Sequence, residues 1–287
     1  MKFSKIIAGT MTWGKWGKDL STAQMSELIK YCFDNGITTF DHADIYGGYT
    51  TEAAFGQAFK KSGVNRDSVE FISKCGIQYM AETRNNKVKH YDLSEKYIIS
   101  SVEQSLKHLH TDHLDLLLLH RPSPLMHPDE IAAASQKLKE QGKIKALGVS
   151  NFTPSQTDLV RSKTEVAANQ IQFSATHFES MLNGDLDHMM LHKIQPMAWS
   201  PLGVLFKEDT PQTTRLKTLM FDLIEKYTAT ADQLLLAWIM KHPAGIIPVI
   251  GTTNTERIAN SIKATEIDLD LEDWFEIQVA SQGHKVP

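Results

Sequence analysis

The sequence predicts an α/β protein built as one closed (β/α)8 barrel, the TIM-barrel fold, over residues 1–287. Eight short apolar segments alternate with segments of helical periodicity, a pattern that calls for a parallel sheet with right-handed crossovers. Eight such units in 287 residues also match the usual length of this barrel. A doubly wound dehydrogenase fold is disfavoured, because no Gly-x-Gly-x-x-Gly motif follows any expected strand.

The expected strands are short runs of apolar and β-branched residues. They span residues 4–8, 37–40, 69–73, 114–119, 146–149, 166–171, 195–199 and 246–250. The run 114–119 is nearly all leucine and lacks the alternation of a half-exposed strand. This composition is typical of a parallel strand that is buried on both faces.

The expected helices show apolar residues spaced three and four apart. They span residues 22–35, 51–60, a long segment from 94, 128–141, 155–162, a segment ending at 227, 230–241 and 255–264. Ser21 or Thr22 can cap the first of these helices, and Gly36 can end it. Residues 76–91 are polar and are expected to form a long loop.

The composition is that of an ordinary globular protein, with 41% apolar and 22% charged residues. The net charge of −4 gives no basic footprint for nucleic acid. No secretory leader and no membrane-length apolar run is evident, so no membrane partner is expected. The only cysteines, Cys32 and Cys75, favour a reducing compartment, and the cytoplasm is the predicted location. No pattern in the sequence indicates an oligomeric state.

Polar residues stand where several expected strands end, and in this barrel active sites form at that end. They are Asp41, Lys74, His120, Ser150, Asn151, Gln170, Trp199, Ser200, Gly251 and Thr252. Asp41, Lys74 and His120 close the second, third and fourth strands, so their side chains are expected to lie close together. Tyr46 follows Asp41 by one short loop that continues into Gly47 and Gly48. Taken alone, an Asp and a Tyr in such a loop are more often a helix cap and a rim aromatic than catalytic residues.

This set of side chains suits proton donation to a carbonyl. A phenol with a pKa near ~10 is a weak acid at neutral pH, and a neighbouring ammonium lowers that pKa. A carboxylate keeps such a lysine charged, and a neutral histidine can donate a hydrogen bond to a carbonyl oxygen. No nucleophile accompanies them. The nearby His108, His110 and His113 fall at the opposite end of their strand, so no metal is expected, and a cofactor must supply the remaining chemistry.

The chain resembles the aldo-keto reductase family over nearly its whole length. The matching motifs occur in the family's order and at strand ends. They are residues 36–41, 43–47, 114–122, 147–152, 169–171 and 200–203. The resemblance implies a catalytic tetrad of Asp41, Tyr46, Lys74 and His120. In it Tyr46 donates the proton, Lys74 lowers its pKa, Asp41 orients Lys74, and His120 polarises the carbonyl.

The resemblance also implies a nicotinamide dinucleotide across the barrel mouth. Ser150, Asn151 and Gln170 match the positions that bind the nicotinamide carboxamide. Trp199 stands where the family commonly stacks a tyrosine on the nicotinamide ring. The positions that match the ribose turn and the pyrophosphate loop are Gly9, Thr10, Met11, Ser200, Leu202 and Gly203.

Residues 251–257 match the family's adenosine-phosphate pocket. There Arg257 is expected to pair with the 2′-phosphate of NADPH, with Thr252 and Thr253 beside it. Gly251 replaces a lysine found in many family members, so NADPH is favoured and NADH stays possible. Asn260 and Ser261 are candidates for adenine contacts, or part of a solvated helix face.

Aromatic residues on loops at the active face are expected to line the substrate pocket. They are Trp13, Trp16, Tyr49, Tyr79 and Phe206, with His177 among them, and they suggest an apolar or planar carbonyl substrate. The predicted function is NADPH-dependent reduction of an aldehyde or ketone. The alternatives are a nucleotide-sensing regulatory subunit on the same fold, and a lyase or hydrolase that uses Asp41 and His120 without a nucleotide.

Overall fold

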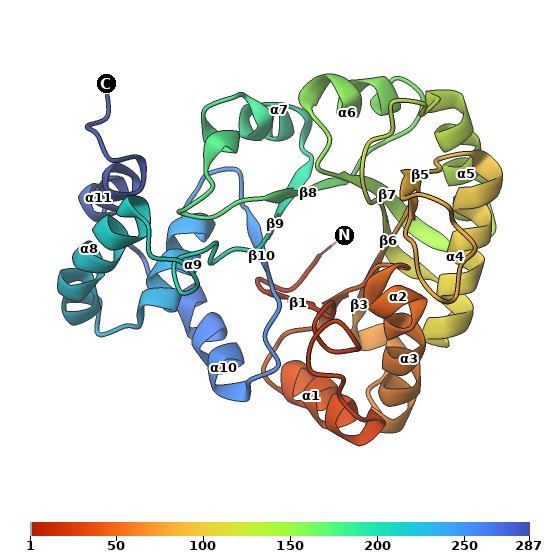
Figure 1. The fold of residues 1–287 in the computed structure, drawn as a ribbon, viewed down its shortest axis with the longest axis horizontal. Helices are drawn as coiled ribbons and strands as arrows, with labels where there is room; N and C mark the ends of the chain where they lie inside the picture. The colour runs from red at the N-terminus through yellow and green to blue at the C-terminus, as the bar shows by residue number, and fades with distance from the viewer. Residues whose placement is uncertain (1) are drawn as a thin grey trace.

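A computed structural model describes residues 2–287 and contains a closed barrel of eight parallel strands surrounded by helices (Figure 1). The strand order around the barrel is β1-β10-β9-β8-β7-β6-β3-β2. The strands are β1 (Ile7–Gly9), β2 (Thr39–Asp41), β3 (Glu70–Cys75), β6 (Leu114–Leu119), β7 (Ile144–Ser150), β8 (Ala168–Gln172), β9 (Gln195–Trp199) and β10 (Ile247–Ile250). The predicted fold class is confirmed.

Helices form the outer layer, with those of the first half of the chain on one side and those of the second half on the other (Figure 1). They are α1 (Thr22–Asp34), α2 (Tyr46–Tyr49), α3 (Thr51–Ser62), α4 (Glu95–Leu109), α5 (Pro128–Glu140), α6 (Pro154–Arg161), α7 (Asp185–His192), α8 (Pro211–Tyr227), α9 (Ala231–Met240), α10 (Thr255–Lys263) and α11 (Leu271–Gln282). Single 3-10 turns are η1 (Arg66–Ser68), η2 (Glu179–Met181) and η3 (Ala264–Glu266). Helices α2, α7 and α11 are not among the helices that the apolar spacing predicts.

Two segments differ from the sequence-based expectation. The first strand begins at Ile7 rather than Ser4. Ser4 is held through side chains instead, because its N–H donates to the Thr39 hydroxyl and its own hydroxyl accepts from the Thr39 N–H. Residues 76–91, expected to be a loop, contain a two-stranded antiparallel sheet. In it β4 (Ile77–Gln78) pairs with β5 (His90–Tyr91).

The barrel interior is filled by apolar side chains from alternating positions of the strands. This inner cluster contains Ile7, Ile72, Leu116, Leu118, Ala168, Met197 and Val249. Leu117 and Leu119 point the other way and pack in the larger core beneath the helices. All six residues of β6 are buried, which confirms that this leucine-rich strand is covered on both faces.

The register of the barrel sets the position of the candidate site. Asp41 pairs with Ile72 of β3, and Lys74 lies two residues further along that strand. Beyond Asp41 the chain still follows β3, because the His42 N–H donates to the Ile72 carbonyl and the Asp44 N–H donates to the Lys74 carbonyl. No helix within residues 2–287 is long and apolar enough to cross a membrane.

Candidate active site

Lys74 is the centre of the site, and its ammonium is 1% exposed. Its Nζ donates to Asp41 Oδ2 at 2.6 Å, to the His42 carbonyl at 2.9 Å and to Tyr46 Oη at 3.1 Å. An ammonium has three N–H donors, so all of them are satisfied. Burial by itself lowers the pKa of Lys74, but the Asp41 carboxylate and the Tyr46 oxygen outweigh it and hold that pKa above its usual value. The lysine is therefore charged.

Tyr46 reaches Lys74 because the loop after β2 turns back on itself. Gly47 and Gly48 have φ of 62° and 68°, a left-handed conformation that glycine adopts without a steric penalty. A Cβ on Gly47 would lie 2.5 Å from Thr51 Oγ1, so the turn is also too tight for a larger residue. The phenol that precedes this turn is buried, with 9% of Tyr46 exposed.

The pKa of the Tyr46 phenol is raised above its ordinary value. Burial is the largest cause; the Lys74 ammonium acts against it, and the Asp41 carboxylate adds to the rise. Lys74 therefore acts to lower the pKa of Tyr46, as expected, but this effect does not outweigh the rise that burial causes. The phenol is protonated at neutral pH, which is the state a proton donor must have.

His120 stands beside Tyr46, with the ring centroids 6.1 Å apart and the planes at 81°. Its backbone N–H donates to the Cys75 carbonyl, which continues the pairing of β6 with β3. Burial and the Lys74 charge lower the pKa of His120 well below its usual value, so the ring is neutral. Its buried Nδ1 has no hydrogen-bond partner within residues 2–287.

Gln170 connects this group to the other side of the barrel. Its Nε2 donates to Asp41 Oδ1 at 2.9 Å, so both Asp41 oxygens accept a hydrogen bond. The Ser150 hydroxyl donates to the Gln170 carbonyl, and Asn151 Nδ2 donates to the Ser150 hydroxyl. Trp199 Nε1 in turn donates to Asn151 Oδ1 at 2.9 Å. Sequence reasoning placed these residues at one mouth but did not find the Gln170–Asp41 contact.

Two non-glycine residues at this mouth have strained backbones. Asn151 and Ser200, directly after β7 and β9, have φ of 58° and 54°. Such conformations persist where the surrounding structure enforces them, and they cluster at functional sites. Gly203 also has a positive φ, and Leu202 beside it is half-buried.

The turn after β1 lies against the same mouth. The Thr10 hydroxyl is buried and donates to the Asp41 carbonyl at 3.0 Å. Gly9 leaves little space for a side chain, since a Cβ there would lie 3.1 Å from Val249. Met11 is 46% exposed and faces outward from the turn.

The expected adenosine-phosphate segment leads into α10. Asn254 caps this helix by accepting from the Arg257 N–H, and the Thr252 hydroxyl accepts from the Asn254 N–H. The helix N-terminus thus points its free amides toward residues 251–253, a favourable place for an anion. Arg257 is exposed; Thr253 and Asn260 are half-buried, and Ser261 is buried with its hydroxyl on the Arg257 carbonyl.

The aromatic residues expected at the substrate pocket separate into different roles. The expectation for Trp13 is corrected, because it is 1% exposed and packs on Phe40 and Phe55 in the core. The Tyr49 hydroxyl accepts from the Tyr79 N–H and braces the loop after β4. Trp16 packs edge-on against Tyr79 and lies 6.2 Å from the Tyr46 ring. Phe206 is 58% exposed.

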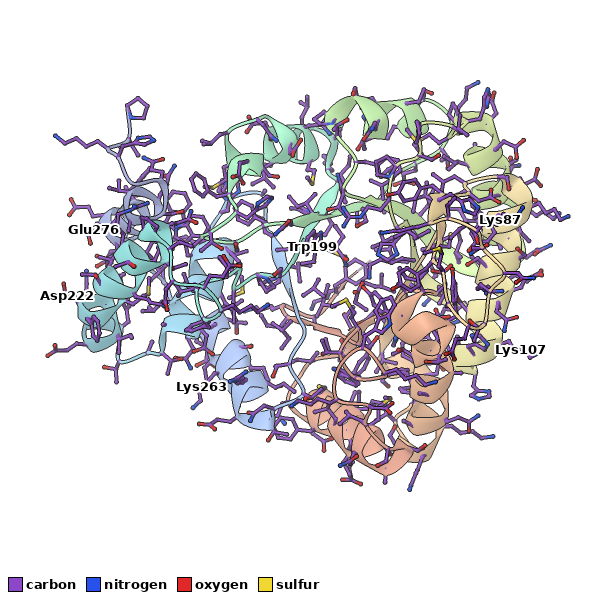
Figure 2. The ribbon with its side chains drawn as sticks, viewed as in Figure 1. Lys87, Lys107, Trp199, Asp222, Lys263 and Glu276 are labelled. Atoms are coloured by element: carbon purple, nitrogen blue, oxygen red, sulfur yellow. The ribbon has the colours of Figure 1, made fainter. Side chains whose placement is uncertain are left out.

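A polar cavity of about 300 Å³ opens at the same mouth, beside Trp199. Its polar lining includes Arg121, Gln172, His177, Glu179, Asn183 and Asp185. The Arg121 guanidinium lies 5.7 Å from the Trp199 ring centroid and has no acidic partner within ion-pair distance among residues 2–287. Figure 2 places Trp199 near the middle of the molecule, whereas Lys87 and Lys107 lie at its periphery.

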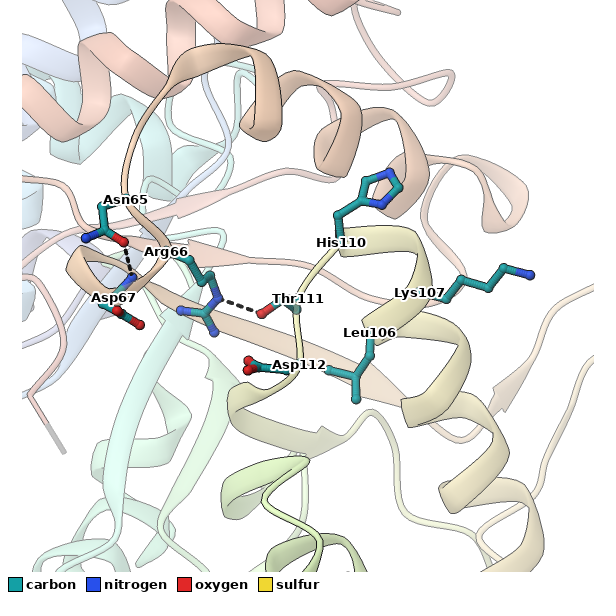
Figure 3. Close-up of a pocket in the computed structure, with 8 residues that line it drawn as sticks. All are labelled: Asn65, Arg66, Asp67, Leu106, Lys107, His110, Thr111 and Asp112. Carbon is teal, nitrogen blue, oxygen red and sulfur yellow. Dashed lines mark hydrogen bonds between the residues drawn. The ribbon is translucent and has the colours of Figure 1, made fainter.

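A second hollow lies at the opposite end of the barrel, between η1 and the end of α4 (Figure 3). Arg66 lines it, but four of the five N–H donors of its guanidinium are used by Thr111, Val69, His113 and Asp115. Lys107 points away from the hollow (Figure 3). This hollow lies at the amino ends of the strands, away from the strand ends that carry Lys74 and His120.

Asp44 is a buried carboxyl that sequence reasoning missed. Its Oδ2 accepts from the Tyr97 hydroxyl at 3.2 Å and from the Ser101 hydroxyl at 3.0 Å, while its Oδ1 has no partner among the described residues. Burial, followed by the nearby Glu52 carboxylate, raises the pKa of Asp44 to about 7. This carboxyl lies two residues before Tyr46, and its backbone is paired with Lys74.

Comparison with known proteins places these features in a family. The family model described as "Aldo/keto reductase family" matches residues 5–282. An uncharacterized oxidoreductase of Bacillus subtilis is 43% identical over 100% of this chain and 97% of the relative. A 6-dehydroglucose reductase of Agrobacterium fabrum is 39% identical over 100% and 97%. A solved structure of a thermostable aldo-keto reductase, 25% identical, superposes with a TM-score of 0.84 over 98% of this chain and 96% of that chain.

The raised pKa of Asp44 predicts a pH-dependent effect of Asp44→Asn. Because the pKa rises from 3.8 to about 7 on folding, the folded state binds the extra proton between these values, and the contribution of Asp44 to stability falls as pH rises. Asparagine keeps an acceptor for Tyr97 and Ser101 but cannot ionise. We expect Asp44→Asn to gain up to about 4 kcal/mol relative to the parent protein between pH 4 and pH 8, measured by urea unfolding.

The matched control is Asp222→Asn, which removes an exposed carboxylate on α8. It should change the free energy of unfolding equally at the two pH values, within about 0.5 kcal/mol. A pH-independent effect of Asp44→Asn would show that this carboxyl titrates normally in the folded protein.

Proposed function

This chain belongs to the aldo/keto reductase family, and we propose that it reduces an aldehyde or ketone to the alcohol with NADPH as its preferred cofactor. The observation that carries this proposal is the buried Lys74 ammonium, which contacts both the Asp41 carboxylate and the Tyr46 hydroxyl. A lysine without a carboxylate partner would extend into solvent at the rim of the barrel, because burying an unpaired charge is costly. Here three hydrogen bonds hold it beneath a protonated phenol.

The four central side chains divide the proton chemistry among them. The nicotinamide, when bound, supplies the hydride for the carbonyl carbon. The Tyr46 hydroxyl gives its proton to the carbonyl oxygen, and Lys74 stabilises the phenolate that remains. Asp41 holds Lys74 in place, and the neutral His120 ring donates a hydrogen bond to the same oxygen. In the oxidative direction Tyr46 takes the proton back.

The polar groups around the mouth suit a nicotinamide dinucleotide. Ser150, Asn151 and Gln170 form one hydrogen-bonded row beside Trp199, whose indole offers a face for the nicotinamide ring. Thr10, Ser200 and Gly203 border the same mouth. The start of α10 offers amides and Arg257 to the adenosine phosphate. The buried cysteines Cys32 and Cys75 are both free, which supports a reducing, cytoplasmic location.

Tyr46→Phe tests the proton donor directly. The variant keeps the ring and its packing but removes the hydroxyl, so we expect NADPH affinity to change less than threefold while kcat for aldehyde reduction falls about 10²–10⁴-fold. Tryptophan quenching measures NADPH binding, and NADPH oxidation with a panel of aldehydes measures turnover. Normal turnover by the variant would refute the role of Tyr46.

The same two assays separate the alternatives. If the parent protein binds NADPH but turns over no carbonyl, the nucleotide-sensing regulatory subunit becomes the better interpretation. If it binds no nucleotide at all, both nucleotide-dependent functions are excluded, and a hydrolase or lyase built on Asp41 and His120 has to be considered.

Arg257→Ala tests the preference for NADPH. The arginine has no other charged partner on α10 within ion-pair distance among residues 2–287, so its loss removes charge-assisted hydrogen bonds that only the 2′-phosphate accepts. We expect the Kd for NADPH to rise about 10–100-fold and the Kd for NADH to change less than twofold. Lys263→Ala, at the other end of α10, is the control and should affect neither. An equal loss for both nucleotides would place Arg257 elsewhere in the site.

The polar cavity favours a small polyhydroxylated aldehyde over the apolar or planar substrate that the aromatic residues suggested. Arg121 directly follows His120, and its guanidinium is free to donate to hydroxyl or carboxylate oxygens. Gln172, Asn183 and Asp185 add donors and acceptors on the opposite wall. The relative named as a 6-dehydroglucose reductase is in keeping with such a substrate.

Arg121→Met tests this substrate class. Methionine keeps the contact with Trp199 but loses every donor, so the KM for glyceraldehyde should rise about 10-fold. The kcat/KM for hexanal, which has no hydroxyl to bind, should stay within about twofold. Lys207→Met, which removes an exposed lysine near Phe206, should alter neither value. Equal losses for both aldehydes in Arg121→Met would contradict a role in recognising hydroxyl groups.

A further inference from the structure

We propose that Asp158, His188 and His192 form a binding site for a divalent transition metal such as Zn²⁺ on the outer surface of the barrel. The site lies between α6 and α7, which run side by side at the periphery (Figure 1). It uses no residue of the candidate active site. Its ligands come from two helices whose preceding loops border the polar cavity.

The three side chains converge from two elements. His188 and His192 are four residues apart on α7, so their rings lie on one face of the helix, with centroids 4.6 Å apart. Asp158 projects from α6 toward them. Its Oδ1 is 2.9 Å from His188 Nε2 and 3.9 Å from His192 Nε2. All three ligand atoms lie within 4.8 Å of one another.

These distances suit a small metal ion after a modest adjustment. Zn²⁺ binds imidazole nitrogen and carboxylate oxygen at about 2.0–2.2 Å, which places tetrahedral ligands about 3.4 Å apart. Rotation of the half-exposed His192 ring brings its Nε2 to that separation. Two imidazoles and one carboxylate leave the fourth position to water. Imidazole ligands select zinc, nickel or copper over magnesium or calcium, which prefer oxygen alone.

The ligands are available for binding. The His192 ring makes no hydrogen bond within residues 2–287, and this side chain is 28% exposed. One group competes with a metal, because Arg161 Nη1 donates to the same Asp158 Oδ1 at 2.8 Å. A metal that binds Asp158 Oδ1 therefore has to displace Arg161 from this oxygen.

A metal at this position would connect two walls of the polar cavity. Helix α6 follows Asn151, Phe152 and Thr153, and α7 follows the loop that carries His177 and Asn183. All of these residues line the cavity. A metal that joins α6 to α7 would therefore restrain the loops that precede these two helices, while the metal itself would lie outside the cavity.

Titration of the purified protein with Zn²⁺ by calorimetry tests the site at pH 7.5. We expect one strong equivalent per chain and a raised Tm with Zn²⁺ present, because a ligand that binds the folded state stabilises it. His192→Ala and Asp158→Asn should each weaken binding at least 10-fold and abolish the Tm shift. Arg161→Ala, which removes the competing cation, should bind Zn²⁺ as tightly or more tightly.

The control is His110→Ala, which removes the histidine that ends α4, apart from α6 and α7, and should bind like the parent protein. Absence of a strong equivalent in the parent protein would overturn the proposal. So would unchanged affinity in His192→Ala or Asp158→Asn, or weaker binding in Arg161→Ala.

Discussion

The ammonium of Lys74 is the constraint on which the site depends. A charge with 1% exposure is tolerated only when each of its donors finds an acceptor. The acceptors are the Asp41 carboxylate, the His42 carbonyl and the Tyr46 hydroxyl, which come from one strand end and the loop after it. The barrel register, the Gly47–Gly48 turn and the pairing of Asp44 with Lys74 all serve to bring them together. Moving any one of these would leave a buried charge without a partner.

Around this buried ion pair, the Tyr46 phenol and the His120 imidazole are held neutral. Burial raises the pKa of Tyr46 and lowers that of His120, so the phenol keeps its proton and the imidazole does not gain one. Opposed shifts of this kind are how one site assigns acid and donor roles at neutral pH. In the proposed reaction, the same low-dielectric surroundings would strengthen the attraction between the Lys74 ammonium and the negative charge that develops on the Tyr46 oxygen.

The barrel and the grouping of Asp41, Lys74 and His120 could be predicted from the sequence. The alternation of strands and helices indicates the barrel, and in this fold the residues that end neighbouring strands lie at one mouth. Interactions across the barrel could not. The Gln170–Asp41 hydrogen bond joins residues far apart in the chain, and Trp13 sits in a loop whose sequence does not reveal that it turns into the core. Helix α7 is not predicted because its four apolar residues do not share one face, with Met190 and Leu191 exposed, and the His188–His192 spacing is not recognised without it.

The mouth of the barrel has two unlike walls, and this asymmetry bears on specificity. On the side of Tyr46 stand Trp16 and Tyr79, which offer flat apolar surface close to the phenol. On the side of Trp199 stand Arg121 and the polar residues after β8. A substrate whose carbonyl lies at Tyr46 must therefore direct its remaining atoms toward one wall or the other. Because Arg121 is half-exposed, water can satisfy a guanidinium that a substrate leaves without an acceptor, and under our proposal the polar wall favours hydroxylated substrates through the hydrogen bonds it adds.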